Sequence, residues 1–508
     1  MALLLLAVTG ASLVAASTRR GGGPYPRPII DAGLVNRITA VQGGQDFGLD
    51  PGIYEPEIEN SGRFAVFHTR TQGISPNVIP GTDNVYVVDL LRRFPNPILV
   101  TSGFDGQPAN GDSFDPVINR GQDEEGRKAT AIAFISAADN LVPGDTNEIP
   151  DVFVYNRLTD TTVRVSIDND GNEGFYGGAL HSICHTDVSI SDDGRFVAFV
   201  AFTVLAEEDQ NEFADIYLHD RDYDENGIFD EREPGTFRTF LVSRNERGES
   251  LNDNCGRPYL SGDGEKIAWV SFATNVLPDS MPPDDNNEID GFCTDVGELR
   301  RTGGICTLLI TQAMDGGWQN IGGCTPSVSR DGRYVSFTSH STNLAPNTGP
   351  VTDPPPLERD VPLKAFVRDM WRTDEGKIVH LSRSRFDGGP PNANCYRTIL
   401  HDGDRLMVTF TTDATDLVTD DTDDVRDVIV SKVLRDDFGD LQIVQNFLIS
   451  RRFPEGEKSN GACNDPTVTS RANVVGVLYT SRASNLTGEN GPPTTGFYDL
   501  YYAIKRLN

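Results

Sequence analysis

Apolar and polar residues alternate in short stretches along most of the chain. Representative stretches lie at 85–90 (VYVVDL), 215–220 (DIYLHD) and 364–369 (KAFVRD). Alternation with a period of two places the apolar side chains on one face of an extended strand. Clusters of Gly, Asn, Asp and Pro, which favour turns, separate the stretches. The pattern predicts an all-β protein built from many short strands.

One longer pattern recurs seven times. A small or polar residue and an Asp-Gly-Arg turn precede an alternating stretch that ends in an aromatic residue, most clearly at 191–199, 261–269 and 329–337. Weaker copies lie at 60–67, 126–134, 401–410 and 470–479. The terminal aromatics, spaced 65 to 73 residues apart, are Phe67, Phe134, Phe199, Trp269, Phe337, Phe410 and Tyr479. A steady period of this length is typical of a repeat architecture.

Each repeat contains enough alternating stretches for four strands. One stretch precedes the Asp-Gly-Arg turn, one follows it, and two more come before the next copy. Four strands in roughly 70 residues make one blade of a β-propeller. We therefore predict a seven-bladed β-propeller over residues 34–508. Its blades fall roughly at 54–113, 114–183, 184–254, 255–323, 324–394, 395–462, and 463–508 together with 34–53.

The two ends of the chain are expected to complete one blade together. The seventh repeat stops at Asn508 after three strands, whereas an additional strand at 36–43 precedes the first repeat. Pairing 36–43 with the stretch at 499–504 closes the ring, and a closed ring leaves no sheet edge open to other chains.

The N-terminal residues predict export. Ala2–Ala16 form an apolar run that is short for a membrane span, and Val14 and Ala16 occupy the −3 and −1 positions of a signal-peptidase site before Ser17. Residues 1–17 are therefore predicted to be a signal peptide and 18–33 a linker. An uncleaved anchor and a protein that is not exported are the alternatives. No later apolar segment is long enough to cross a membrane, so we expect a secreted or periplasmic protein.

The Asp-Gly-Arg core at 191–199 (SDDGRFVAF), together with NLVPGDTNEIPDVFVYNR at 140–157, resembles the TolB-like, WD-repeat-like propeller repeat of exported bacterial proteins. The resemblance covers about 34–508. It implies a propeller scaffold that usually serves as a protein-interaction module.

The charge balance narrows the range of partners. The chain has 75 acidic residues against 44 Lys and Arg, for a net charge of −31. Such a surface repels nucleic acid and anionic membranes. It is compatible with bound cations or with a salty or extracellular habitat. We expect a monomer that binds an unidentified protein or glycan and no nucleic acid.

Residues 222–233 (DYDENGIFDERE) contain the strongest candidate metal site. Carboxylate and amide side chains stand on alternate residues around Gly227, which allows a sharp turn, and calcium prefers such hard oxygen ligands. The predicted calcium ligands are Asp222, Asp224, Asn226, the Ile228 carbonyl, Asp230 and Glu233. The flanking stretches are strands, so the loop is an insertion in a hairpin. The alternative is a solvated acidic turn.

A second acidic motif recurs between the second and third strands of the blades. Its copies are Asp145, Asn147 and Asp151; Asp209, Asn211 and Asp215; Asp421, Asp423 and Asp427; and a shortened copy, Asp285, Asn287 and Asp290. These side chains can bond to their own backbone and fix the turn. Weak cation sites are the alternative.

The seven cysteines fall into two groups. Five recur 68 to 71 residues apart, at Cys184, Cys255, Cys324, Cys395 and Cys463, and are expected to be small, buried side chains at one equivalent position. A soft-metal site is the alternative. Cys293 and Cys306 flank a predicted hairpin, and in an exported protein we expect a disulfide between them.

Enzyme motifs are few. The chain has no G-x-S-x-G elbow, H-E-x-x-H, P-loop or Rossmann pattern. We therefore expect a non-catalytic binding scaffold stabilised by calcium. The alternative is a carbohydrate-active enzyme, a polysaccharide lyase or hydrolase, with a site on the propeller axis. His181, His185 and Arg257 are the residues available for such chemistry. A calcium-driven adhesin is a third option. Convergence of polar side chains from several blades at one mouth of the channel would distinguish a ligand site from a plain scaffold.

Overall fold

A computed structural model describes residues 34–37, 54–91, 96–121, 129–174, 185–278, 281–350, 357–372, 378–403, 405–419, 421, 423–436, 440–451, 456–471, 474–486 and 498–506. Every described residue belongs to one compact unit, 32–508. The predicted signal peptide and the whole of the predicted linker lie outside the described residues. No helix among the described residues has the length and apolarity to span a membrane.

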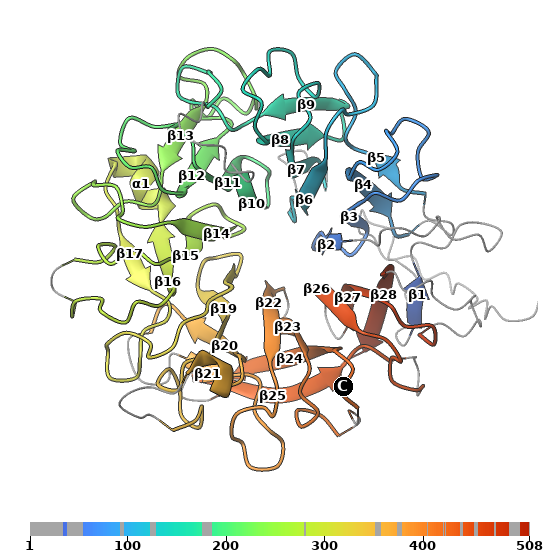
Figure 1. The fold of residues 1–508 in the computed structure, drawn as a ribbon, viewed down its shortest axis with the longest axis vertical. Helices are drawn as coiled ribbons and strands as arrows, with labels where there is room; N and C mark the ends of the chain where they lie inside the picture. The colour runs from blue at the N-terminus through green and yellow to red at the C-terminus, as the bar shows by residue number, and fades with distance from the viewer. Residues whose placement is uncertain are drawn as a thin grey trace, which may run out of the picture. The chain divides into compact units, whose positions relative to one another are not determined.

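Seven four-stranded antiparallel sheets surround a central axis (Figure 1). The first four are β2(Tyr54–Ile58)–β3(Phe64–Thr69)–β4(Asn84–Asp89)–β5(Ile98–Leu99), β6(Ser113–Ile118)–β7(Ala131–Ser136)–β8(Asp151–Asn156)–β9(Thr161–Arg164), β10(His185–Ile190)–β11(Phe196–Ala201)–β12(Asp215–Asp220)–β13(Arg238–Leu241) and β14(Cys255–Leu260)–β15(Lys266–Ser271)–β16(Asp290–Asp295)–β17(Thr307–Leu309). The others are β18(Ser327–Val328)–β19(Tyr334–Ser339)–β20(Lys364–Asp369)–β21(Ile378–His380), β22(Cys395–Asp402)–β23(Leu406–Thr412)–β24(Asp427–Arg435)–β25(Leu441–Leu448) and β26(Cys463–Arg471)–β27(Val474–Ser481)–β28(Asp499–Arg506)–β1(Leu34–Arg37). The predicted all-β, seven-bladed propeller is confirmed.

The N-terminal strand completes the last blade, as predicted. β1 pairs antiparallel with β28, with Leu34 opposite Ile504 and Arg37 opposite Tyr501. In Figure 1 the blue β1 lies beside the red β28. The strand begins two residues before the predicted 36–43, and residues 38–43 lie outside the described part of the chain. The pairing gives β28 a partner on its outer side and so covers the edge of the blade.

The recurring aromatic of each repeat forms the core of its blade. All seven, from Phe67 to Tyr479, are fully buried. Five stack on an aromatic of the third strand, as Phe134 does on Phe153 with ring centroids 5.9 Å apart, and Trp269 contacts Phe292 in a tilted arrangement. Phe410 instead faces Ile429. Each aromatic contacts the next strand of its own blade. The same local contact therefore recurs from blade to blade, and this recurrence produces the regular period of the sequence.

The Asp-Gly-Arg turn has a structural role. In the third blade Gly194 takes the left-handed conformation, with φ of 83°, which glycine adopts without steric cost. Ser191 donates to Asp193 within the turn, and Arg195 pairs with Asp220 at the end of β12, Nε to Oδ1 2.7 Å. The motif therefore ties the second strand to the third.

Residues 293–306 differ from the predicted bridged hairpin. A short helix, α1 (Val296–Thr302), separates β16 from β17. Cys293 lies opposite Leu308, whereas Cys306 precedes Thr307, the partner of Thr294. The two cysteines are therefore diagonal neighbours, which lie about 7–8 Å apart and exceed the reach of a disulfide. Both thiols are free, and the predicted Cys293–Cys306 bridge is wrong.

Candidate functional site

The first strand of six blades contains a β-bulge at the same place. The ladder register shifts near the start of β2, β6, β10, β14, β22 and β26, which lie nearest the axis in Figure 1. One residue in each bulge has positive φ, between 41° and 56°. These residues are Glu55, Asp115, Asp187, Arg257, Arg397 and Asp465. In the fifth blade Thr325 occupies the corresponding place before β18.

The six residues are all charged, and none is a glycine. A left-handed residue other than glycine costs about 1–2 kcal/mol, and aspartate tolerates the conformation better than glutamate or arginine do. Such strain is typical of functional sites, where the bulge directs a side chain. Proline follows four of the six, at 56, 116, 258 and 466, and proline within a sheet is found at edges and bulges. The backbone therefore holds a charged ring at one end of the inner strands.

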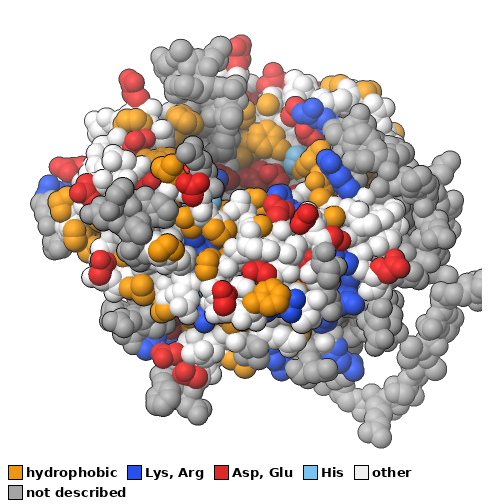
Figure 2. All heavy atoms as spheres, turned by 60° about the horizontal axis from the view of Figure 1, so that its bottom comes forward, with side chains coloured by type: hydrophobic (Ala, Val, Ile, Leu, Met, Phe, Trp, Pro, Cys, Tyr) orange, Lys and Arg blue, Asp and Glu red, His pale blue; other side chains and the backbone are white. Residues whose placement is uncertain are grey.

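Six of the seven ring residues line one cavity of 460 Å³, together with Pro466 next to the seventh, Asp465. The volume falls within the range of roughly 300–1,000 Å³ typical of small-molecule sites. Figure 2 shows the molecule hollowed near its middle, with acidic side chains inside the hollow. Ring residues from six blades thus converge on one cavity, to which the seventh blade contributes Pro466, and this convergence is the arrangement expected of a ligand site.

A layer of three residues forms the floor of this cavity. Arg120 donates from Nε to Glu57 Oε1 at 3.0 Å, and its guanidinium lies 5.9 Å from the centre of the Tyr259 ring. The same three residues also line a second, smaller cavity of 60 Å³. They therefore lie where the two cavities adjoin, and the ring residues line the larger one. We call it the axial cup.

One side of the axial cup is acidic. The carboxylates of Glu55, Asp115 and Asp187 come from three consecutive blades. Burial, followed by the charges of Glu55 and Asp187, raises the pKa of Asp115 well above its usual range. Burial raises the pKa of Asp187 as well, although Arg257 opposes the shift. Asp115 Oδ2 accepts from the Val188 amide at 3.1 Å, so each carboxylate faces the next blade.

His68 compensates the negative charge of Glu55. Burial alone would raise its pKa, but hydrogen bonding and charge from His68 lower the pKa below its usual value. His68 Nε2 lies 3.4 Å from Glu55 Oε2, and its Nδ1 lies 3.5 Å from Asp83 Oδ1. Burial opposes the charge of His68, yet the two carboxylates raise its pKa to about 9. Glu55 and Asp115, neighbours in the ring, are thus shifted in opposite directions.

The other side of the axial cup is basic. Arg257 donates from Nη1 to the Cys324 carbonyl at 3.0 Å and to Thr325 Oγ1 at 3.1 Å. Arg397 lies 3.3 Å from Asp465. Of the residues proposed from sequence for acid–base chemistry, Arg257 lies in the axial cup. His181 is outside the described residues, and the side chain of His185 is not described.

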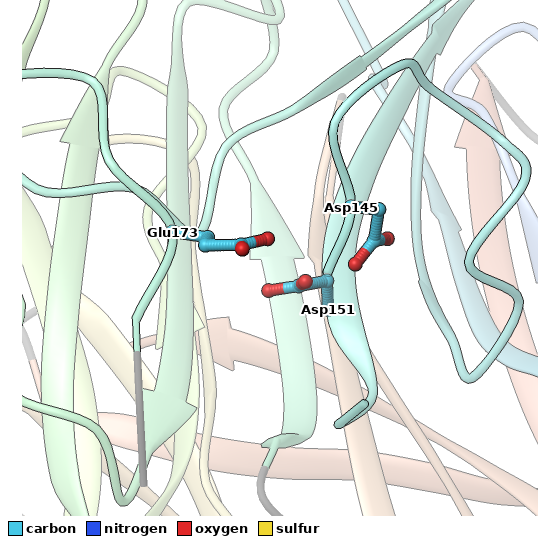
Figure 3. A group of neighbouring side chains, drawn as sticks. All are labelled: Asp145, Asp151 and Glu173. Atoms are coloured by element: carbon cyan, nitrogen blue, oxygen red, sulfur yellow. The ribbon is translucent and has the colours of Figure 1, made fainter. Parts of the chain in front are cut away.

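The recurring acidic motif produces two groups that could hold a metal ion. In each, three carboxylates offer oxygens that all lie within 4.8 Å of one another. The first group, Asp145, Asp151 and Glu173, brings the start of β8 together with a neighbouring loop (Figure 3). Arg164 Nη1 contacts all three, at 2.7 to 3.1 Å.

The second group consists of Asp421, Asp423 and Asp427. Lys458 Nζ lies 2.5 to 2.6 Å from an oxygen of each. In both groups a cationic side chain of the same blade therefore already neutralises the carboxylates. The sequence motif included Asp145, Asp151 and the second group, but Glu173, Arg164 and Lys458 were missed because they lie on later segments.

The fourth-blade copy of the motif is shifted by one residue from its predicted place. Asn286, like Asn147 in the second blade, donates from Nδ2 to the aspartate that begins the third strand, here Asp290. The copy is therefore Asp284, Asn286 and Asp290 at full spacing, and the shortened copy at 285 and 287 is wrong. A hydroxyl ending the blade donates to the same aspartate, as Thr311 does to Asp290 at 2.7 Å.

The loop predicted to bind calcium has ordered internal contacts. The Asp222 carboxylate accepts from the amides of Asn226 and Gly227, at 3.0 and 3.1 Å. Arg221 forms a two-pronged pair with Asp230, Nε to Oδ1 2.7 Å. Asn226 donates to Asp224 at 2.9 Å. No three carboxylates of this loop gather within 4.8 Å, although all of 222–233 is described. The calcium ligand set at 222–233 stays a prediction.

The periodic cysteines are buried within the blades. Cys255, Cys395 and Cys463 begin the inner strands, and each lies against a hydroxyl of the second strand, such as Ser481 Oγ at 3.2 Å from Cys463. Cys324 is also buried, one residue further along than the equivalent position. Cys184 lies outside the described residues. The prediction of small, buried side chains is confirmed for the four periodic cysteines among the described residues.

No protein-family model and no curated protein sequence matches the chain. Similar solved structures include the β-propeller domain of the Trilobed protease from Pyrococcus furiosus, with 11% identity, a TM-score of 0.43, and coverage of 90% of this chain and 97% of that one. The polysaccharide lyase Uly1 has 12% identity and a TM-score of 0.39, with 94% and 98% covered. A GH93 α-L-arabinofuranosidase of Fusarium graminearum has 10% identity and a TM-score of 0.37, with 94% and 98% covered. The likeness is one of fold.

Proposed function

We propose that this propeller is a binding protein that holds a small polar ligand in the axial cup and does not transform it. One observation carries the proposal: six blades direct ring residues into one cavity, and five of these residues are charged and have a left-handed backbone. The retention of charged side chains at positions where glycine would fit without strain needs a cause. It is explained if the side chains serve a ligand.

Three further properties belong to the same proposal. The chain is exported as a TolB-like repeat protein, acts as a monomer in the periplasm or outside the cell, and gains stability from calcium at 222–233. The apolar residues at 2–16 and the alternating oxygen ligands of the loop support these statements. A protein or glycan partner would present the group that enters the axial cup.

A carbohydrate-active enzyme is the second candidate, and one observation favours it. The pKa of Glu55 is lowered while that of its neighbour Asp115 is raised. Two carboxyl groups held in opposite protonation states suit general acid–base chemistry. If this candidate holds, an acidic or neutral polysaccharide will be cleaved, and Asp115→Asn will abolish cleavage while leaving the melting temperature within about 2 °C.

A ligand panel tests the binding proposal. The melting temperature is measured with amino acids, amines, sugar acids and neutral sugars at millimolar concentration, because a ligand that binds only the native state raises it. We expect at least one class to raise the melting temperature in the wild type and in Arg301→Gln, which changes an exposed arginine on α1. The same class should have no effect on Arg257→Gln or Asp115→Asn. A panel without any such ligand would refute the proposal.

A further inference from the structure

The axial cup contains a guanidinium without a carboxylate partner. Arg257 bonds to a carbonyl and a hydroxyl, and no carboxylate among the described residues lies within 4.0 Å of its nitrogens. The charge of Arg257 lowers the pKa of Asp187, which also accepts a hydrogen bond from the Arg257 backbone, but the guanidinium itself forms no ion pair with a described residue. Its planar fork of donors matches a carboxylate, which binds through two parallel hydrogen bonds. This part of the cavity is therefore suited to a carboxylate of the ligand.

The acidic side of the axial cup contains a carboxylate oxygen without a hydrogen-bond partner in the described part of the chain. Asp115 Oδ2 is held by the Val188 amide, while Asp115 Oδ1 has no hydrogen-bond partner among the described residues. Burial, followed by the carboxylates of Glu55 and Asp187, disfavours a negative charge on Asp115, and the charge of Arg397 opposes these effects only in part. A cationic group placed beside Asp115 and Asp187 would relieve the repulsion among these carboxylates.

The spacing of the acidic side distinguishes an organic cation from a metal ion. Calcium requires oxygens at about 2.3–2.6 Å, so its ligand atoms crowd together. Three carboxylates do gather within 4.8 Å at two places in the blades, but no three of the ring carboxylates do so, although all four are described. An ammonium group with its three donors can bond to acceptors that stand further apart.

We propose that the axial cup binds a zwitterion of the amino-acid type, with its ammonium group against Asp115 and Asp187 and its carboxylate against Arg257. This inference rests on the proposed binding function and assigns its ligand class. The three residues come from consecutive blades, so one small molecule reaches all of them. Tyr259 and the proline rings at 116 and 258 supply the apolar wall for the aliphatic part of the molecule.

Matched probes test the assignment by calorimetry on the full chain. Glycine, 4-aminobutyrate and 6-aminohexanoate vary the distance between the two charges. Butylamine lacks the carboxylate, butyrate lacks the ammonium, and D-glucuronate represents an acidic sugar. We expect one of the zwitterions to bind about tenfold or more tightly than butylamine, and butyrate to give no heat.

Two variants separate the two ends of the site. Arg257→Gln should reduce zwitterion affinity to that of butylamine and leave butylamine binding unchanged. Asp115→Asn should weaken both by about tenfold, and asparagine tolerates the left-handed backbone at this position. Arg301→Gln is the control for a lost arginine. Circular dichroism and the ligand-free melting temperature establish that each variant is folded.

The outcomes distinguish the ligand class from the site. If D-glucuronate or butyrate binds more tightly than every zwitterion and Arg257→Gln abolishes that binding, the zwitterion assignment is overturned while the axial cup remains a ligand site. If no probe binds at 20 mM and the wider panel also raises no melting temperature, the assignment and the proposed function both fail.

Discussion

At the scale of single residues, the most informative feature is backbone strain at charged positions. A bulge turns the side chain toward the axis, and glycine would adopt the required φ without strain. At each of the six bulges a charged residue stands where glycine would fit the backbone. The chain therefore retains side chains at an energetic cost, and this cost can be measured.

Arg257 allows that measurement, because glycine and alanine both remove its side chain. At φ of 53°, alanine keeps the strain and glycine relieves it. We expect Arg257→Gly to be more stable than Arg257→Ala by about 1 kcal/mol in denaturant unfolding. Gly256 provides the control, since alanine there meets no atom within 4 Å. Equal stability of the two Arg257 variants would mean that the bulge stores no strain.

His68 makes stability depend on pH in a defined direction. Its pKa is raised from 6.5 to about 9 by Glu55 and Asp83 despite burial. A raised histidine pKa stabilises the native state fully below pH 6.5, and the stabilisation disappears as the pH rises through about 9. At 1.36 kcal/mol per pKa unit, the difference is about 3 kcal/mol.

The measurement compares unfolding free energies of the wild type and His68→Gln at pH 6 and pH 9.5. We expect the wild type to lose more stability than the variant over this interval. Parallel loss in the two proteins would show that His68 is neutral in the native state.

At the scale of elements, a hydroxyl at the end of the fourth strand caps the start of the third strand in six of the seven blades among the described residues. Ser243 Oγ donates to Asp215 at 2.5 Å and accepts the Ile216 amide at 2.8 Å. The fifth blade has Lys364 in place of the aspartate, and its Nζ donates to the His340 and Pro362 carbonyls. The Ser or Thr seen at the end of these repeats thus has a structural cause.

The second feature at the scale of elements is the closure of the ring by the N-terminal strand. Deleting residues 1–37 removes β1 and exposes the outer edge of β28. Four ladder residues supply two to four hydrogen bonds, each worth about 1 kcal/mol, so we expect a loss of about 2–4 kcal/mol and a tendency to associate. Deleting only 1–33 is the control. Equal unfolding curves and equal sedimentation for the two truncations would contradict a closing role for β1.

The third feature at the scale of elements is the loop at 222–233. If it binds calcium, added calcium should raise the melting temperature, since the ion binds only the native loop. Asp222→Ala combined with Asp224→Ala should remove the shift, whereas Asp105→Asn, in an exposed turn of the first blade, should preserve it. Arg221 would have to release Asp230 to free that ligand. An unchanged melting temperature at millimolar calcium would leave the loop an acidic turn.

The blades could be predicted from sequence because their determinants are local and repeated. The aromatic anchors, the Asp-Gly-Arg turn and the terminal hydroxyl contact partners within one blade. The axial cup could not, because its residues differ from blade to blade. Glu55, Arg257 and Thr325 share a position but no chemistry, and a bulge leaves no trace in the period-two pattern. The repeated proline after a charged residue was the available signal.

At the scale of the whole molecule, the axial cup lies where all seven blades contribute and no single blade suffices. The inner strands supply one ring position each, so replacing one residue changes the chemistry of the site without altering the scaffold. The same division explains how a strongly repetitive sequence can carry a site without repetition. In such a propeller the blades form the scaffold, whereas the ring residues determine the chemistry of the site and hence its function.

The net charge and the buried aspartates together set the response of the molecule to pH. Burial raises the pKa of Asp215 and of Asp290, which form no ion pair with a described residue, to about 7. The folded state therefore binds more protons than the unfolded state between about pH 4 and pH 7, and stability falls as the pH rises through this interval. Mutual repulsion within a chain of charge −31 acts in the same direction. Arginine lowers the pKa of other carboxylates, such as Asp369 and Asp413. These groups lose their contribution to the stability of the folded state only below about pH 4.

We therefore expect the melting temperature to be highest near pH 5 and several degrees lower at pH 8. Asp215→Asn should flatten this profile, because asparagine can accept from Ser243 as the aspartate does while carrying no charge to be desolvated. Added salt should raise the melting temperature at pH 8 more than at pH 5, because screening acts on the repulsion but not on the buried groups. Scanning calorimetry from pH 4 to pH 9 makes the measurement for both proteins. A wild-type maximum at or above pH 8, or a profile that Asp215→Asn leaves unchanged, would show that the buried aspartates are ionised in the folded molecule.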